Sequence, residues 1–218
     1  YENLMEGRVS VKPIGLNPVR RLAATWTEEL GTDPRSLAEI TASAEASMLL
    51  DTWEGYRDAD KGWKHALIAD QDSAVALGGY VENFALGELP RASMEEVKFV
   101  EALTRYALRL HPDAVEVHRA AAVFAIERGR LDQCLEHGNA ARKASAQDAR
   151  THLVLARCFF EGNVDLSVEE AEQARRLDPE LRLATRVLGS AYARQGRFAS
   201  ALRSLNARLE ATPGESAT

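Results

Sequence analysis

The sequence predicts an all-α fold, an α-solenoid of stacked antiparallel helix pairs. The first observation is a recurrence, because Gly129, Gly162 and Gly196 end helical segments and are spaced by 33 and 34 residues. The second is that two helical segments run into Pro179 and Pro213, which are again 34 residues apart. The third is composition, since alanine and leucine are abundant and only 6% of the residues are aromatic. A fixed period of this length is typical of repeat architectures.

Apolar residues within the period follow helical spacing. In residues 181–196 one apolar stripe is formed by Leu183, Val187, Leu188, Ala191 and Tyr192. One helix pair cannot bury both of its faces, so such pairs are expected to stack. Gly189 lies in the middle of this helix, where glycine costs about 1 kcal/mol relative to alanine. We therefore predict that the following helix packs closely against Gly189.

The clearest copy of the repeat spans residues 182–215. Its marker residues are Leu188, Gly189, Tyr192, Gly196, Phe198, Ala201, Leu205 and Pro213. This pattern resembles the tetratricopeptide repeat, a 34-residue helix–turn–helix unit, although Thr185 and Arg208 depart from it. Weaker copies extend the resemblance over residues 35–215, as about five helix pairs with an insertion at 87–93. The resemblance implies a superhelix whose first helices line a concave groove.

The first 34 residues have a different pattern. Residues 8–12 alternate apolar and polar side chains, which indicates a short strand. Residues 18–31 form an amphipathic pattern, with Asn17 as a candidate N-cap and Gly31 as the end of the helix. Residues 1–34 are therefore interpreted as an N-terminal extension, either a capping segment for the first repeat or the tail of a preceding domain.

The inner positions that the resemblance assigns are rich in arginine. They are Arg119, Arg150, Arg157, Phe160, Arg186 and Arg194. The arginine fork suits carboxylates and phosphates, so the groove is expected to bind a peptide or protein segment, including an acidic one. In the alternative interpretation these arginines are solvated, or paired with Glu116, Glu127 and Glu161. A chaperone-tail clamp, known in this family, is not expected, because Ala44, Met48 and Ala76 replace its polar donors.

The last helix suggests a second surface. Leu202 and Leu209 lie on the side of residues 198–211 that would cover a following repeat. An exposed apolar strip of this kind marks an interface, and a homodimer is one candidate. The alternative function is therefore a structural or assembly scaffold that acts by self-association or by docking to other domains of its own chain.

Other function classes lack support in the sequence. There is no phosphate-binding loop, nucleophile elbow or zinc-ligand spacing, so no enzyme activity, catalytic residue, cofactor or metal is expected. The net charge of −6 does not favour nucleic-acid binding, and no apolar run is long enough to span a membrane. Cys134 occupies a small-residue position of the repeat and is interpreted as a packing residue, with Cys158 in the next helix. A reducing, cytoplasmic environment is expected, and a disulfide between the two cysteines is the alternative if they face each other. Ser167 is predicted to cap a helix whose acidic residues 169–172 form a solvated face.

Overall fold

The computed structural model describes residues 17–211, and within this range it contains helices and turns but no strand. The α-helices are α1 (Arg20–Leu30), α2 (Leu37–Met48), α3 (Trp53–Ala69), α4 (Ala74–Asn83), α5 (Met94–Leu110), α6 (Val115–Glu127), α7 (Leu131–Ala144), α8 (Ala149–Phe159), α9 (Val164–Leu177), α10 (Arg182–Arg194) and α11 (Phe198–Ala211). A π-helical turn, η1 (Phe84–Glu88), and a 3₁₀ turn, η2 (Leu89–Arg91), connect α4 to α5. The predicted all-α class is confirmed.

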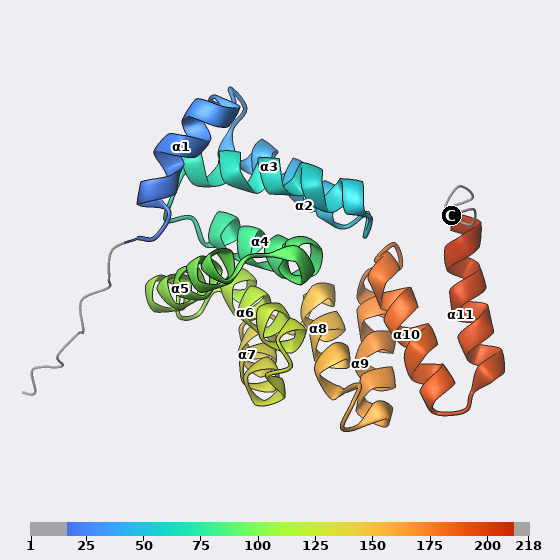
Figure 1. The fold of residues 1–218 in the computed structure, drawn as a ribbon. Helices are drawn as coiled ribbons and strands as arrows, with labels where there is room; N and C mark the ends of the chain where they lie inside the picture. Colours follow the sequence, from blue (N-terminus) through green and yellow to red (C-terminus); the bar gives the residue numbers. More distant parts are fainter. Residues whose placement is uncertain (1–16, 212–218) are drawn as a thin grey trace, which may run out of the picture.

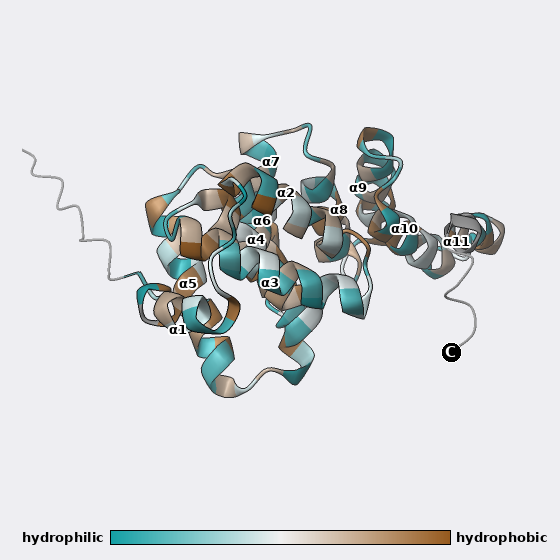
Figure 2. Cartoon of the chain, turned by 90° about the horizontal axis from the view of Figure 1, so that it is seen from above, coloured by the Kyte–Doolittle hydropathy of each residue, from teal (hydrophilic) through white to brown (hydrophobic). Residues whose placement is uncertain are grey.

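The helices from α2 onward form antiparallel pairs, α2/α3, α4/α5, α6/α7, α8/α9 and α10/α11, which stack in chain order (Figure 1). Helix α1 precedes them and packs against α3. Seen from above, hydrophilic and hydrophobic residues are interspersed on the same helices (Figure 2), as expected for amphipathic helices. The predicted α-solenoid architecture is confirmed. No helix in the described range is long and apolar enough to cross a membrane.

Local sequence signals set several helix ends. Ser36 with Glu39 and Ser93 with Glu96 form capping boxes at the starts of α2 and α5. Asn17 is not the N-cap of α1, as the sequence suggested, because the helix begins at Arg20 and its N-cap is Val19. The Asn17 carboxamide oxygen instead accepts the Val19 N–H at 2.8 Å in the preceding turn. Its amide nitrogen donates to the Gln71 carbonyl at 2.9 Å, which ties α1 to the turn after α3. The strand predicted at residues 8–12 lies outside the described residues.

Gly189 is a close-packing site, as predicted. The glycine is buried in α10, and a Cβ placed there would lie 2.9 Å from the Cδ2 atom of Leu205 on α11. A real Cβ does not approach another carbon so closely, so a larger residue would push the Leu205 side chain or the helix away. The cost of glycine within the helix is therefore offset by closer interhelical contact.

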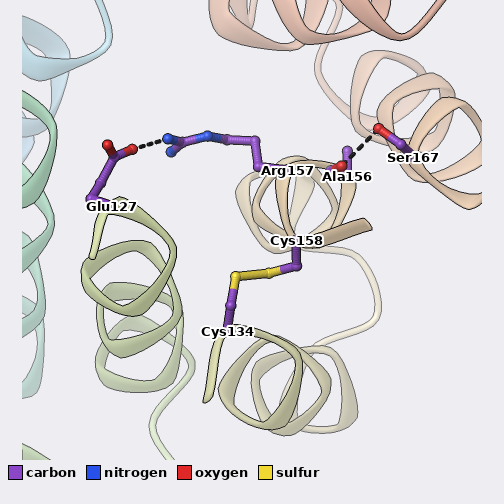
Figure 3. The surroundings of a disulfide bond; sticks show 6 residues. All are labelled: Glu127, Cys134, Ala156, Arg157, Cys158 and Ser167. Carbon is purple, nitrogen blue, oxygen red and sulfur yellow. Dashed lines mark hydrogen bonds and ion pairs between the residues drawn. A yellow bond between two sulfur atoms is a disulfide. The ribbon is translucent and has the colours of Figure 1, made fainter. Parts of the chain in front are cut away.

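The two cysteines form a disulfide, which corrects the sequence-based interpretation. Cys134 on α7 and Cys158 on α8 are both buried, and their Cα atoms lie 5.9 Å apart (Figure 3). The repeat places these positions on neighbouring helices of successive pairs, and Cys134 does occupy a small-residue core position as expected. The bond covalently joins the third helix pair to the fourth.

The prediction for Ser167 was wrong. Helix α9 begins three residues earlier, where the Asn163 side chain accepts the Leu166 N–H. Ser167 is fully buried, and its hydroxyl donates to the Ala156 carbonyl at 2.7 Å (Figure 3). The acidic run is not all solvated either, because Glu170 is buried beside His152 and Arg142.

Candidate functional site

The predicted inner residues lie on α6, α8 and α10, the first helices of the last three pairs, but they separate into two groups. Arg119 on α6 and Arg150 on α8 are buried, with 7% and 8% of their surface exposed. The other members are partly or fully exposed and lie nearer the C-terminal end of the array: Arg157, Phe160, Arg186 and Arg194. Arginines on the inner side of the repeats are therefore buried in one part of the array and exposed in the other.

The buried group forms an ion network around Glu82 of α4. Glu82 receives Arg119 Nε at 3.0 Å and Arg150 Nη2 at 2.8 Å. Arg119 also pairs with Asp148, the N-cap of α8, at 3.0 Å, and Arg150 pairs with Glu45 of α2. Because the five side chains come from α2, α4, α6 and the start of α8, the network joins the first helices of four successive pairs.

The network is ionised because its charges compensate for burial. Burial opposes ionisation of Glu82, but the charges of Arg150 and Arg119 outweigh it and hold the pKa of Glu82 below its ordinary value. Burial likewise opposes ionisation of Asp148, yet Arg119 and a hydrogen bond from Thr151 lower the pKa of Asp148. Removing one member would leave a buried charge without its partner, which is strongly destabilising.

Arg119 and Arg150, which the sequence assigned to the groove, are buried in this ion network and do not belong to the exposed arginines. The physical reason is the closure of the superhelix, which brings Glu45 of α2 against Arg150, 105 residues later in the chain. These two arginines are therefore held by carboxylates of the solenoid itself. Ala44, Met48 and Ala76, which stand at the positions of the clamp's polar donors, are buried.

The exposed group surrounds a groove of about 400 Å³ between the ends of α6, α8 and α10. We call it the arginine groove, and it is lined by Ile126, Arg157, Phe160, Glu161, Leu183, Arg186, Val187 and Ser190. Its floor is apolar, and charged side chains stand at its rim. Arg194 lies at its edge, with its guanidinium 5.0 Å from the centre of the Phe160 ring.

Each arginine of this groove has an acidic neighbour. Arg194 pairs with Glu161 at 2.8 Å, and Arg157 pairs with Glu127 at the end of α6 (Figure 3). These are two of the three partners that the alternative interpretation named. Sequence reasoning did not find the third contact, in which Arg186 lies 3.4 Å from Asp51 in the turn between α2 and α3. The arginines are thus partly neutralised, yet the side chains of Arg186 and Arg194 remain 48% and 40% exposed.

Positive charge is nevertheless concentrated in the groove. Burial, followed by the charge of Arg186, lowers the pKa of Arg157 from its ordinary value. The charge of Arg186 therefore disfavours the charged form of Arg157, and a bound anion would offset this repulsion. Sequence reasoning predicted both arginines but missed the floor residues Ile126, Leu183 and Val187, although the last two belonged to the apolar stripe of α10.

The C-terminal edge of the array exposes apolar side chains on α11. Leu202 is 60% exposed, as predicted, and Phe198 is 67% exposed. Leu205, which contacts Gly189, is itself 37% exposed. The side chain of Leu209 lies outside the described part of the chain. Figure 1 shows α11 at the outer end of the stack.

Comparison with solved structures identifies the fold. A Thermus thermophilus protein described as a thermophilic TPR protein, TTC0263, superposes with a TM-score of 0.62 at 17% identity, covering 81% of this chain and 93% of that chain. A fragment of MamA from Desulfovibrio magneticus RS-1 gives a TM-score of 0.52 at 14% identity, covering 80% and 98%. The chain has the tetratricopeptide-repeat fold.

A third structure with the tetratricopeptide-repeat fold, YrrB, is described as having an unusual peptide-binding site. It gives a TM-score of 0.50 at 18% identity, covering 88% of this chain and 95% of that chain. No family model matches the sequence, and no curated protein matches it. The resemblance to the tetratricopeptide repeat is thus supported by structure, where helix packing is retained at low sequence identity.

Proposed function

We propose that the protein is an interaction module whose arginine groove binds a peptide segment with a carboxylate or phosphate next to an aliphatic side chain. The observation that carries this proposal is the meeting of Arg157, Arg186 and Phe160 around an apolar floor. Pockets of this kind bind ligands through apolar contact, while a few polar groups determine orientation. The protein acts through binding, with neither enzymatic activity nor a cofactor.

The ion pairs at the rim do not prevent such binding. Exposed ion pairs contribute little, typically 0 to about 1 kcal/mol, so an incoming anion can replace a carboxylate at small cost. Arg186 offers the most accessible guanidinium, because it is about half exposed and its acidic neighbour lies 3.4 Å away. Arginine has five N–H donors in a planar fork, so it can contact Asp51 and a ligand carboxylate together.

Peptide binding by charge variants tests this proposal. An array of random octapeptides, some containing phosphoserine, would be probed with the full chain, and the affinity of the best acidic peptide measured by fluorescence anisotropy. We expect Arg157→Ala with Arg186→Ala to weaken binding at least tenfold and to reduce its salt dependence. The matched control is Arg175→Ala with Arg176→Ala on the exposed face of α9. Equal affinity of the groove and control variants would reject the proposal, as would an array without enrichment of acidic peptides.

A second candidate function, assembly through the C-terminal edge, is favoured by the exposed strip of Phe198 and Leu202. We propose that a second copy of the chain covers this strip and forms a two-fold dimer. Sedimentation of the chain is expected to show a dimer that Leu202→Glu with Leu209→Glu dissociates. A monomer at high micromolar concentration, unaltered by these substitutions, would remove this candidate.

The cytoplasmic localisation expected from the sequence remains a prediction, and the disulfide argues against it. Disulfides persist mainly in oxidising compartments and are rare in the cytosol. We therefore propose that the protein works in an oxidising environment. Mass spectrometry of alkylated protein from its native cells would show Cys134 and Cys158 protected from alkylation before reduction. Free thiols at both positions would restore the cytoplasmic prediction.

A further inference from the structure

A second groove, of about 620 Å³, lies on the opposite side of α4 from the ion network. Tyr80 lines this groove, whereas Glu82, two residues later and about 200° further round the helix, faces the inner arginines. We call it the aromatic groove, and its walls come from α1, α3, α4, η1 and α5. It is therefore separate from the arginine groove and from the inner surface to which the tetratricopeptide resemblance assigned binding.

The walls of the aromatic groove are formed by aromatic rings in mutual contact. Trp26 and Tyr80 have ring centres 5.6 Å apart, and Phe99 lies edge-on to Tyr80 at 6.3 Å. Phe84, at the start of the π-helical turn, also lines the groove. π-Helical turns are often found at functional sites, and this one contributes both Phe84 and the acidic Glu88 to the groove.

The rim is predominantly acidic, and part of this charge is not neutralised. Four carboxylates line the groove, those of Asp60, Glu88, Glu95 and Glu96, against two cations, Lys64 and Arg91. Lys64 donates to Asp60 at 2.7 Å, and its ammonium lies 5.7 Å from the centre of the Trp26 ring. Arg91 stacks 4.3 Å from the Trp53 ring, and Glu96 is held in the Ser93 capping box. Among the described residues, Glu88 and Glu95 then have neither an ion-pair nor a hydrogen-bond partner.

Tyr80 provides an independent sign of a ligand. Its side chain is more than nine-tenths buried, and within the described part of the chain its hydroxyl has no hydrogen-bond partner. Burial raises the pKa of Tyr80, and the negative charges of Asp60, Glu96 and Glu88 raise it further. The hydroxyl therefore stays protonated and lies in a negative field at the groove.

We propose that the aromatic groove binds a peptide segment in which an arginine or lysine is adjacent to an apolar side chain. The apolar side chain packs on Phe99, whose ring is half-buried, while the cation lies at the rim, because Lys64 already lies over the Trp26 ring. Glu88 and Glu95 pair with the same cation at the rim. This charge preference is opposite to that of the arginine groove, so the protein would join two segments of different chemistry.

The random octapeptide array tests this proposal with the full chain. We expect a class of binding peptides with arginine or lysine beside an aromatic or aliphatic residue. Fluorescence anisotropy with the best peptide of this class should show a loss of at least tenfold for Glu88→Gln with Glu95→Gln. Tyr80→Phe, which keeps the ring, should cost only a fewfold loss. Two substitutions with the same charge change on the exposed face of α1, Glu28→Gln with Glu29→Gln, serve as the control.

The outcomes also separate this proposal from that of the arginine groove. Arg157→Ala with Arg186→Ala should leave the cationic peptide bound with unchanged affinity. An array without a cationic apolar class would overturn the proposal. So would equal affinity of the Glu88 and Glu95 variant and the α1 control variant, whatever the acidic peptides do.

Discussion

The two groups of inner arginines differ in what surrounds them rather than in where the repeat places them. Around Glu82, α2, α4, α6 and α8 converge, and Arg119 and Arg150 are enclosed by carboxylates. Beyond α8, only α10 adds to the inner surface, and Arg186 remains about half exposed. We call the inner surface around Glu82 the closed region and the inner surface along α10 the open region. An inner arginine therefore stabilises the fold in the closed region and is accessible to ligands in the open region.

The largest expected effect comes from breaking the closed region. Glu82→Gln removes the carboxylate that two buried arginines share, and we expect a loss of about 3 to 5 kcal/mol in the free energy of unfolding. Glu161→Gln, which removes the exposed partner of Arg194, should cost less than about 1 kcal/mol. Urea denaturation followed by circular dichroism measures both. Similar losses for the two variants would mean that the buried Glu82 network stabilises the fold no more than an exposed ion pair does.

The disulfide tests how the third helix pair is attached to the fourth. Cys134 and Cys158 join α7 to α8 across 24 residues. The chain-entropy model for a loop of this size gives a stabilisation of about 3.5 kcal/mol. We expect Cys134→Ser with Cys158→Ser to lower the free energy of unfolding by about this amount. An unchanged urea midpoint for the double variant would show that the bond between α7 and α8 does not contribute to stability.

Close packing in the open region is tested at Gly189. Gly189→Leu places a branched side chain against Leu205, and overpacking of this kind costs about 1 to 3 kcal/mol. Ala193→Leu is the control, because Ala193 is exposed on the same helix. The thermal midpoint should fall only for the Gly189 variant. Equal midpoints would show that α10 and α11 can separate without loss.

The pH dependence of stability provides a smaller but specific signal. Glu82 and Asp148 have folded-state pKa values below their ordinary values, so their stabilisation is complete at neutral pH. It is lost as the pH falls through those lowered values, by at most about 1.4 kcal/mol per pH unit for each proton bound. In urea titrations below pH 4.5, Glu82→Gln should show a shallower loss than the original chain. Parallel curves would assign the acid sensitivity to other groups.

The sequence predicted the architecture because the repeat is a local signal. The spacing of Gly129, Gly162 and Gly196 and the stripe on residues 181–196 reflect contacts between neighbouring helices, which sequence periodicity records. The arginine positions were predicted for the same reason. Burial of Arg150 could not be predicted, because it depends on Glu45, which only closure of the superhelix brings near. The aromatic groove also lay beyond sequence reasoning, since Trp26, Tyr80 and Phe99 come from three separate helices.

The most direct test of the division between the two regions compares one substitution in each of them. Arg150→Ala and Arg186→Ala remove the same side chain from equivalent inner surfaces, and urea denaturation gives the free energy of unfolding of both. We predict a loss of about 3 kcal/mol for Arg150→Ala, which leaves the buried Glu82 with Arg119 as its remaining arginine partner. Arg186→Ala should lose less than about 1 kcal/mol, because its ion pair is exposed. Equal losses, or a larger loss for Arg186→Ala, would contradict the division.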